Sequence, residues 1–386
     1  MNLLHAFSNW KWTGPAEPAV RLAAGLDARA GHDVVFACGR CPYDDLENRV
    51  ADEARAAGLE VADDLVLKKH FALMSGTRDL RRLTDLIESR EIDVVHTHLQ
   101  NDHLLAGAAA RRAGRGLIVR TVYGGRDLTK PLRRRIAFGR LTDGVIAASE
   151  ASAADVRRRT DIEPERLFVV PGAVDTDRFS PEARSERRAA ERARLGIPDD
   201  AVALGIVARV QRHRRYELLL EAFASVAAAA PRARLVIIGR GTYYDELLAR
   251  PARRLGLEDR LILAGYREGT EYDDVLSALD AGLFLVPGSD GSCRAARELL
   301  ACGLPMIVTR RDPLPEIVED GVSGFVVEES VEALGRAIGV IASRDDDRGA
   351  MGAAARTRAE ASFSLAGQVS RVEGIYERLR ALGRRA

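Results

Sequence analysis

The chain has 386 residues, of which 46% are hydrophobic, so it can form two domains that each bury a sizeable core. Its formal net charge of only +1 excludes the strongly basic surface of a typical nucleic-acid-binding protein. No apolar stretch approaches the roughly 20 residues of a membrane span, and Met1 leads directly into "NLLHAF" without the basic start of a signal peptide. We therefore expect a cytoplasmic protein that binds no nucleic acid.

Short apolar segments alternate with amphipathic ones along residues 1–180. The first strand is expected in "NLLHAF" and the first helix in "PAVRLAAGLDARAG". Further strands are expected at residues 33–39, 93–98, 117–123, 144–149 and 167–172. Near-continuous apolar strands are typical of a parallel sheet that is covered on both faces. The alternation of strands and helices predicts an α/β fold with a doubly wound, Rossmann-like domain.

A charged stretch without a strand, residues 180–196, separates this pattern from a second one. Strands are then expected at residues 201–209, 232–241, 260–265, 281–286 and 305–309. We therefore predict a second Rossmann-like domain over residues 181–365, facing the first domain, residues 1–180, across a cleft. The last helical run, residues 366–386, is expected to pack back on the first domain.

Asp290 and Glu298 frame the start of a helix that is expected to end near Ala301. Ligands of such sheets bind beyond the carboxyl ends of the strands, where Asp290 lies, and Glu298 could accept hydrogen bonds from ribose hydroxyls. The amides that begin this helix could donate to phosphate or sugar oxygens: Gly291, Ser292, Cys293 and Arg294. The spacing leaves an alternative open, in which Asp290 only favours the helix dipole and Glu298 is solvated.

Two arginines follow the first strand of the second domain. Arg209 ends that strand, and Arg214 stands before the next helix. Guanidinium groups suit a diphosphate because each presents a fork of hydrogen-bond donors to phosphate oxygens. Ordinary surface charge is the alternative interpretation.

The first domain offers two candidates at comparable positions. His98 ends a strand, with His96 on the same face, and could hydrogen-bond a sugar; it could equally fill a corner of the core. Gly14 follows the first strand, where a close approach of the backbone to a phosphate or sugar is possible, although an ordinary loop glycine is the alternative.

The segment of residues 111–140 carries ten basic residues and one acid, Asp127. Its stretch "KPLRRRIAFGRL" combines charge with apolar side chains, which indicates peripheral contact with an anionic membrane at its inner face. A solvated helix is the alternative. Cys38 and Cys41 form a single CxxC pair without a second pair at zinc spacing, so we expect no metal site.

Three longer motifs together resemble the retaining glycosyltransferases of family 4, which have the GT-B fold. "VVPGAVDTDRFSP" is similar to their interdomain segment, and "ARVQRHRRYELLLEAF" to their donor-diphosphate motif, in which an arginine is followed five residues later by a lysine. Here Arg209 matches the arginine, and Arg214 stands at the lysine position. "DGSCRAARELLACGLP" is similar to their segment with two glutamates; Asp290 stands at the first and Glu298 matches the second.

The resemblance implies a role for each candidate residue. Arg209 and Arg214 neutralise the diphosphate leaving group, while Asp290 and the amides after it hold the donor sugar. Glu298 binds the ribose, His98 contacts the sugar from the first domain, and Gly14 lies near the phosphates. The residues with implied catalytic roles are His98, Asp290, Arg209 and Arg214. No metal or other cofactor is implied, because the basic pair does the work of a cation.

The chain also departs from the family pattern. Asp290 is one methylene shorter than the usual glutamate, and Arg214 is bulkier than a lysine. Gly172 stands where an asparagine is usual, and Tyr123 stands where a histidine is common. These departures bear on the identity of the donor sugar more than on the fold.

The expected function is the transfer of a sugar, with retention at the anomeric carbon, from a UDP-sugar or a GDP-sugar to a hydroxyl. The acceptor is a sugar, lipid or small molecule that the sequence does not name. A hydrolase or epimerase is the nearest alternative enzyme. An alternative of another class is a non-catalytic protein of the same fold that binds nucleotide-sugars or a membrane surface.

Overall fold

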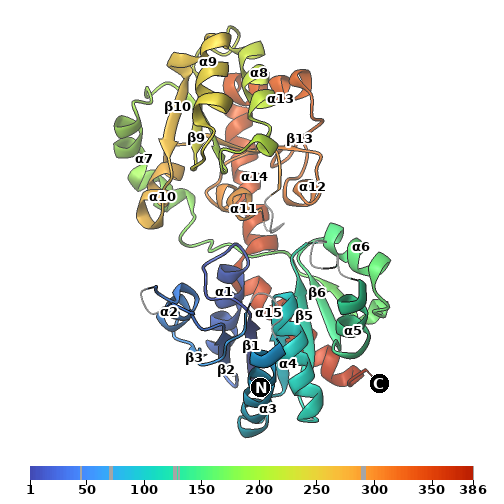
Figure 1. Ribbon diagram of the computed structural model, residues 1–386. Coiled ribbons are helices and arrows are strands. Elements are labelled where there is room, and N and C mark those ends of the chain that lie inside the picture. The colour runs from blue at the N-terminus through green and yellow to red at the C-terminus, as the bar shows by residue number, and fades with distance from the viewer. Residues whose placement is uncertain (44–45, 69–72, 125–127, 129–130, 288–292, 386) are drawn as a thin grey trace. The chain divides into compact units, whose positions relative to one another are not determined.

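The computed structural model describes residues 1–43, 46–68, 73–124, 128, 131–287 and 293–385. Clustering of contacts divides the chain into two compact units (Figure 1). Unit 1 contains Met1–Gly172 and Leu365–Ala386, and unit 2 contains Ala173–Ser289 and Cys293–Ser364. The chain thus leaves unit 1, forms unit 2, and returns to unit 1 with its last helix.

Unit 1 is built on a parallel sheet of seven strands in the order β3-β2-β1-β4-β5-β6-β7. The strands are β1 (Asn2–Phe7), β2 (Asp33–Cys38), β3 (Glu60–Ala62), β4 (Val94–Thr97), β5 (Leu117–Val122), β6 (Gly144–Ala147) and β7 (Leu167–Val169). The helices are α1 (Ala16–Asp27), α2 (Arg49–Ala56), α3 (Leu73–Ser89), α4 (Gln100–Arg112), α5 (Pro131–Arg140), α6 (Glu150–Arg159) and α15 (Leu365–Leu382). The six strands predicted from apolar segments are all present, whereas β3 was missed.

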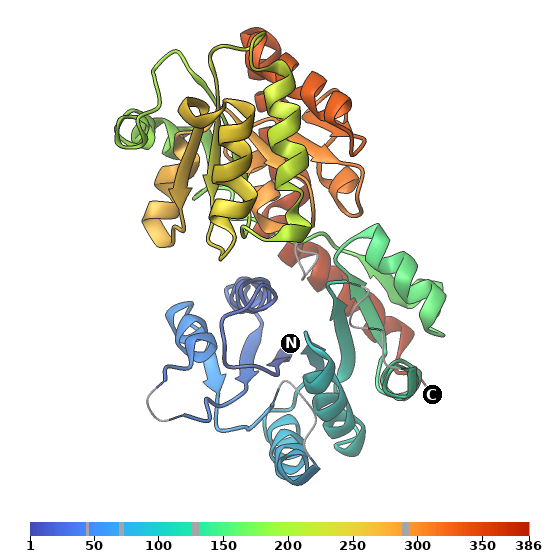
Figure 2. The same cartoon turned by 45° about the horizontal axis from the view of Figure 1, so that its top comes forward.

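Helices cover both faces of this sheet (Figure 2). One buried cluster joins side chains of α1, α2 and α15 to the sheet, including Leu26, Val50 and Val372. A second cluster joins α3 and α4 to the opposite face, including Leu83 and Leu105. Because both faces are buried, the strands are mostly apolar along their length, which is the pattern seen in the sequence.

The last helix, α15, packs closely against unit 1 because its neighbours include a glycine. A β-carbon placed on Gly144, at the start of β6, would lie only 2.3 Å from the Leu379 side chain, so a larger residue would force this side chain of α15 to move. Polar contacts fix the helix along its length. Arg29 donates to the Ser370 hydroxyl at 2.6 Å, and His32 lies 2.9 Å from the Glu373 carboxylate.

Unit 2 is built on a parallel sheet of six strands in the order β10-β9-β8-β11-β12-β13. The strands are β8 (Val202–Val207), β9 (Ala233–Ile238), β10 (Leu261–Gly265), β11 (Ala281–Phe284), β12 (Met306–Thr309) and β13 (Gly324–Val327). The helices are α7 (Pro181–Leu195), α8 (Tyr216–Val226), α9 (Arg250–Leu255), α10 (Gly269–Ser277), α11 (Arg294–Ala301), α12 (Leu314–Ile317), α13 (Val331–Ser343) and α14 (Asp345–Phe363). The five predicted strands are present, and β13 was missed.

The charged stretch before the first strand of unit 2 forms helix α7, which begins at the cap residue Ser180 and ends at Gly196 in the left-handed conformation. Two of its arginines bind the same carboxylate. Arg188 lies 2.6 Å and Arg192 3.1 Å from the oxygens of Asp280, directly before β11. The charge that sets this stretch apart in the sequence therefore docks α7 on its own unit.

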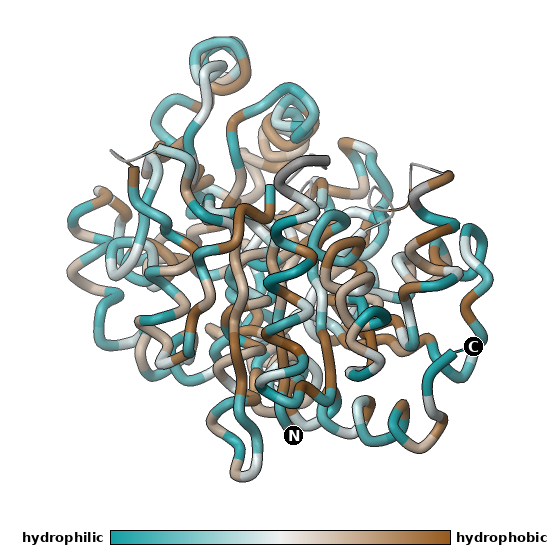
Figure 3. Tube along the Cα trace, turned by 60° about the horizontal axis from the view of Figure 1, so that its bottom comes forward, coloured by the Kyte–Doolittle hydropathy of each residue, from teal (hydrophilic) through white to brown (hydrophobic). Residues whose placement is uncertain are grey.

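Apolar residues gather in the strands, as the brown segments of Figure 3 show. Within the described part of the chain, none of the helices combines the length and the apolar character needed to cross a membrane.

Candidate functional site

Each sheet reverses its strand order once, between β1 and β4 in unit 1 and between β8 and β11 in unit 2. Ligands of doubly wound sheets bind beyond the carboxyl ends of the strands at such a reversal. The candidates fall at these positions. Gly14 follows β1 and His98 follows β4, while Arg209 follows β8 and Cys293 follows β11.

Arg209 is exposed, and a buried side chain holds its backbone in place. The buried Tyr216 hydroxyl donates to the carbonyl oxygens of Ala208 at 3.1 Å and of Arg209 at 3.4 Å. Burial raises the pKa of Tyr216, so its proton is retained for these bonds. The strand end thereby presents the Arg209 side chain on a rigid base.

Two glycines after β9, which the sequence analysis did not single out, let the next loop pass close to Arg209. A β-carbon on Gly239 would lie 2.1 Å from the Ala208 carbonyl oxygen, and one on Gly241 would lie 2.1 Å from that of Val210. Side chains at either position would separate the two loops. The sequence signal was "GRG" directly after a strand.

Arg214 is half-buried and reaches the loop that follows β11. Its Nη1 donates to the Val286 carbonyl oxygen at 2.7 Å and to that of Pro287 at 3.4 Å. The structure thus joins the predicted diphosphate motif to the first residues of the segment that leads to Asp290. Three predicted site residues lie outside the described part of the chain: Asp290, Gly291 and Ser292.

Glu298 is only 3% exposed, so the alternative that it is a solvated helix residue is wrong. The Tyr272 hydroxyl donates to its Oε2 at 2.5 Å, and Arg294 Nε lies 3.1 Å from its Oε1. Burial, together with this carboxylate, holds the pKa of Tyr272 well above its usual value. Cys293, the buried residue that precedes α11, has a positive φ of 44°. Binding of ribose by Glu298 stays a prediction.

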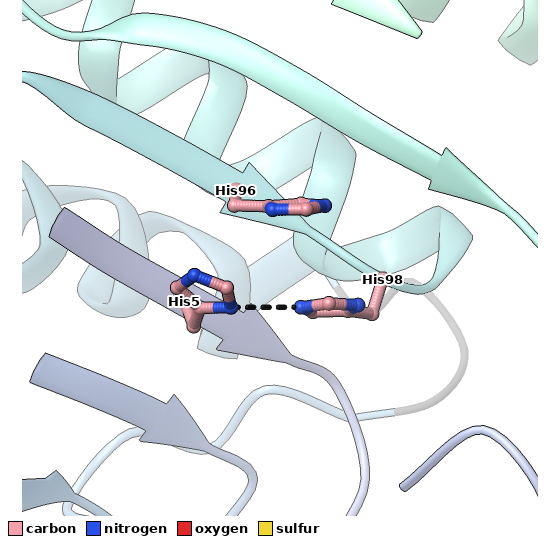
Figure 4. A group of neighbouring side chains, drawn as sticks. All are labelled: His5, His96 and His98. Atoms are coloured by element: carbon pink, nitrogen blue, oxygen red, sulfur yellow. Dashed lines mark hydrogen bonds between the residues drawn. The ribbon is translucent and has the colours of Figure 1, made fainter. Parts of the chain in front are cut away.

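In unit 1, three buried histidines meet at the strand reversal (Figure 4). His5 comes from β1, His96 from β4, and His98 from the residue after β4. His5 Nδ1 lies 3.1 Å from His98 Nε2, and the rings of His96 and His98 stack with centroids 4.6 Å apart. The ligating atoms of the three rings lie within 4.8 Å of one another, which is also the arrangement of a possible metal group.

Hydroxyl groups complete a histidine network, by which we mean these three rings with Tyr123, Tyr376 and Thr121. His98 Nδ1 lies 2.9 Å from the Tyr123 hydroxyl. His96 lies 2.6 Å from the Tyr376 hydroxyl through Nδ1 and 2.7 Å from the Thr121 hydroxyl through Nε2. The hydrogen bonds of His96 and His98 therefore occupy both nitrogens of each ring.

Burial keeps these rings neutral. It lowers the pKa of His5 to about 3, and it lowers the pKa values of His96 and His98 well below their usual value, helped by the neighbouring histidines. A neutral ring has one donor and one acceptor nitrogen, so a consistent chain of bonds can run from Tyr123 through His98 and His5. The network thus ties β1 and β4 together and, through Tyr376, holds α15.

These contacts bear directly on His98. The His98 side chain is fully buried. One of its hydrogen-bond partners is Tyr123, which stands where a histidine is common in family 4. Contact with a donor sugar would require one of its two hydrogen bonds to be exchanged, and it stays a prediction. Gly14 is exposed in the turn before α1, so its backbone is accessible to a ligand.

Asp102, which the sequence analysis missed, anchors the loop after β1. Its carboxylate accepts hydrogen bonds from the amides of Ser8 at 2.8 Å and Leu99 at 2.9 Å, and Arg120 lies 3.6 Å away. Burial nevertheless raises its pKa to about 7. Among the described residues, Ser8 Oγ and Asn101 Oδ1 are buried here without a hydrogen-bond partner.

The basic segment 111–140 does not form one continuous surface. Arg120 lies in the core of unit 1, and Arg111 binds the buried Asp143 carboxylate at 2.7 Å. Helix α5 does expose two apolar side chains, Leu132 at 69% and Ile136 at 45%, beside its arginines. Among the described residues of the segment, α5 is therefore the candidate for contact with a membrane.

Two family models match the chain, and together they span most of it. The model of Glycosyltransferase Family 4 matches residues 14–178, and that of Glycosyl transferases group 1 matches residues 187–358. The chain belongs to glycosyltransferase family 4, as its motifs predicted.

Relatives in sequence are D-inositol 3-phosphate glycosyltransferases. The one from Corynebacterium jeikeium is 31% identical over 272 residues, which are 67% of this chain and 64% of that protein. The one from Segniliparus rotundus is 30% identical over 209 residues, 52% of this chain and 45% of that protein. The chain thus spans about half to two thirds of the length of these relatives.

Solved structures confirm the predicted GT-B fold. Anabaena HepE in complex with UDP superposes with a TM-score of 0.79 at 18% identity, covering 98% of this chain and 100% of that one. A glycosyltransferase from Rickettsia africae gives a TM-score of 0.80 at 16% identity, with 99% of each chain covered.

Proposed function

We propose that the protein is a retaining glycosyltransferase that moves a sugar from a nucleotide-diphosphate donor to a hydroxyl. The observation that carries this proposal is the placement of Arg209 and Arg214 at the strand reversal of unit 2, in the chain order expected of family 4, with Glu298 on the helix that follows β11. UDP is the first choice of nucleotide because HepE, a structural neighbour, has been crystallised with UDP and with UDP-glucose. GDP is the second choice.

Arg209 and Arg214 would act by stabilising negative charge on the leaving diphosphate. As the bond between the anomeric carbon and the phosphate oxygen breaks, charge grows on the diphosphate. Arginine donors placed beforehand stabilise that charge more in the transition state than in the bound donor, which lowers the barrier. The acceptor hydroxyl attacks from the face that the diphosphate leaves, so the configuration at the anomeric carbon is retained.

We further propose that the reaction needs no metal ion, since two guanidinium groups can neutralise the diphosphate. The three-histidine group of unit 1 does not change this proposal, because its rings are engaged in hydrogen bonds with one another and with hydroxyl groups. Turnover should be the same in EDTA and in magnesium. Loss of activity in EDTA that manganese or magnesium restores would contradict it.

The acceptor is assigned to unit 1. Gly14 and His98 are proposed to approach the phosphates and the transferred sugar, respectively. The relatives are named for D-inositol 3-phosphate, so this compound belongs among the acceptors to be tested. For a lipid acceptor, α5 is proposed to rest on an anionic membrane. Co-sedimentation with anionic vesicles should then weaken with salt and with Leu132→Ser.

Mass spectrometry after incubation with UDP- and GDP-sugars tests the function directly. Transfer predicts a product heavier than the acceptor by one sugar residue, together with free UDP or GDP. Release of free sugar without any acceptor product would indicate a hydrolase. Binding of the nucleotide-sugar without turnover would indicate a non-catalytic protein.

A further inference from the structure

The loops after β1 and β2 gather aromatic side chains at one edge of unit 1. Both tryptophans of the chain, Trp10 and Trp12, lie in the loop after β1, and Tyr43 lies in the loop after β2. The two strands are neighbours in register, with Phe7 opposite Cys38. The loops therefore emerge side by side at the carboxyl edge of the sheet, where ligands of such folds bind.

Hydrogen bonds hold the backbone of the first loop in place. The buried Asn9 side chain accepts from the amides of Trp10 at 3.0 Å and Lys11 at 3.2 Å. The Trp10 carbonyl oxygen in turn accepts from the Val50 amide of α2 at 3.3 Å. The loop is thus ordered in advance of any ligand, which reduces the entropy that binding would cost.

Two side chains of these loops, Lys11 and Tyr43, are exposed to solvent. Tyr43 is 56% exposed, and its ring meets the Trp10 ring edge-on with centroids 6.1 Å apart. The Lys11 ammonium lies 4.8 Å from the centroid of the Trp10 ring. Lys11 is exposed, and no carboxylate of the described residues lies within 4 Å of its ammonium. We call Trp10, Lys11 and Tyr43 the aromatic platform.

We propose that the aromatic platform is an acceptor subsite for a six-membered polyol ring, either a pyranose or a cyclitol. The C–H face of such a ring suits the negative face of an aromatic side chain, and its hydroxyls or an anionic substituent suit the Lys11 ammonium. This proposal rests on the proposed function, because it names the class of acceptor that receives the sugar. It does not depend on the residues of unit 2.

Tryptophan fluorescence tests the platform without catalysis, because both tryptophans lie in this loop. Methyl β-D-glucopyranoside, myo-inositol, myo-inositol 1-phosphate and the ringless glycerol 3-phosphate are titrated with and without UDP. The ring compounds should change the emission at concentrations where glycerol 3-phosphate does not. A stronger response to the phosphorylated ring would assign an anionic substituent to Lys11. Tyr43→Ala should weaken ring binding roughly 10-fold, and Tyr43→Phe should restore it.

Val322→Ala truncates an apolar side chain of unit 2 that is 47% exposed and serves as the control, with ring affinity and UDP affinity expected to match the wild type. If UDP binds but no ring compound changes the emission, or if Tyr43→Ala binds rings as tightly as the wild type, the platform proposal is overturned while the proposed function stands. If rings bind and UDP does not, the platform stands as a polyol site and the proposed function fails.

Discussion

The two strand reversals of this protein hold polar residues in opposite ways. In unit 1, His5, His96 and His98 are fully buried, neutral and bonded to neighbouring side chains. In unit 2, Arg209 is exposed, and Arg214 reaches across to the loop after β11. Buried polar groups that satisfy one another rigidify a fold, whereas exposed charge at a strand end is available to a ligand. The contrast supports our proposal that unit 2 binds the donor, whereas the histidines of unit 1 stabilise its fold.

Acid should affect unit 1 most. In the folded chain the pKa values of His5 and His103 are about 3, and those of His96 and His98 also lie well below 6.5. Because unfolding lets these rings take up protons, the free energy of unfolding should fall as the pH drops from about 6.5 towards 3. For His5 and His103 the loss at pH 5 is roughly 2 kcal/mol each. Asp102, with its pKa raised to about 7, titrates in the opposite sense and offsets part of the loss.

Urea denaturation followed by tryptophan emission measures this loss, since both tryptophans belong to unit 1. The exposed His213 of unit 2 provides a control, because His213→Ala should leave the pH profile unchanged. Equal midpoints at pH 7 and pH 5 would show that the histidine network does not stay neutral on folding.

Asp290→Asn tests whether the Asp290 carboxylate positions the donor sugar. Loss of a positioning contact should lower kcat about 100-fold. Affinity for UDP should stay near the wild-type value, because the other donor-binding residues are unchanged. Asp290→Glu restores the residue usual in the family and serves as the matched variant, with activity retained. A sugar-mass adduct on the peptide that contains Asp290 would instead identify a covalent nucleophile.

Tyr376→Phe tests whether the histidine network stabilises the fold of unit 1. The change leaves a buried histidine nitrogen without its partner 2.6 Å away and should lower the free energy of unfolding by about 1–3 kcal/mol. The same substitution at Tyr266, whose hydroxyl bonds Glu268 on the surface, should cost less than about 0.5 kcal/mol. Equal effects of the two substitutions would argue against a stabilising network.

The architecture was predictable because strands buried on both faces leave apolar segments that a reader of the sequence can find. Two strands escaped, β3 and β13; each lies at an edge of its sheet and is only partly buried, so it lacks the continuous buried pattern of the central strands. The positions of Arg209 and Arg214 after the first strand of unit 2 were predictable for the same reason, since motifs at strand ends keep their spacing.

The partners of the candidate residues were not predictable. His96 bonds Tyr376, which is 280 residues away in the chain, and Glu298 bonds Tyr272, which is 26 residues away. No local pattern connects such pairs, because only the packing of α15 and α10 brings them together. Burial of His98 could not be inferred either. The local sequence around a histidine at a strand end is the same whether its side chain faces solvent or a second histidine.

The proposed function depends most on the diphosphate site of unit 2. UDP binding to the Arg209→Ala/Arg214→Ala variant tests this site most directly. By isothermal titration calorimetry, Arg209→Ala alone should weaken UDP binding by about 1.5–3 kcal/mol, and the double variant should weaken it further. Arg232→Ala, which removes an exposed arginine before β9 that pairs with Asp345, should bind UDP normally. A folded double variant that binds UDP as tightly as the wild type would contradict the central claim.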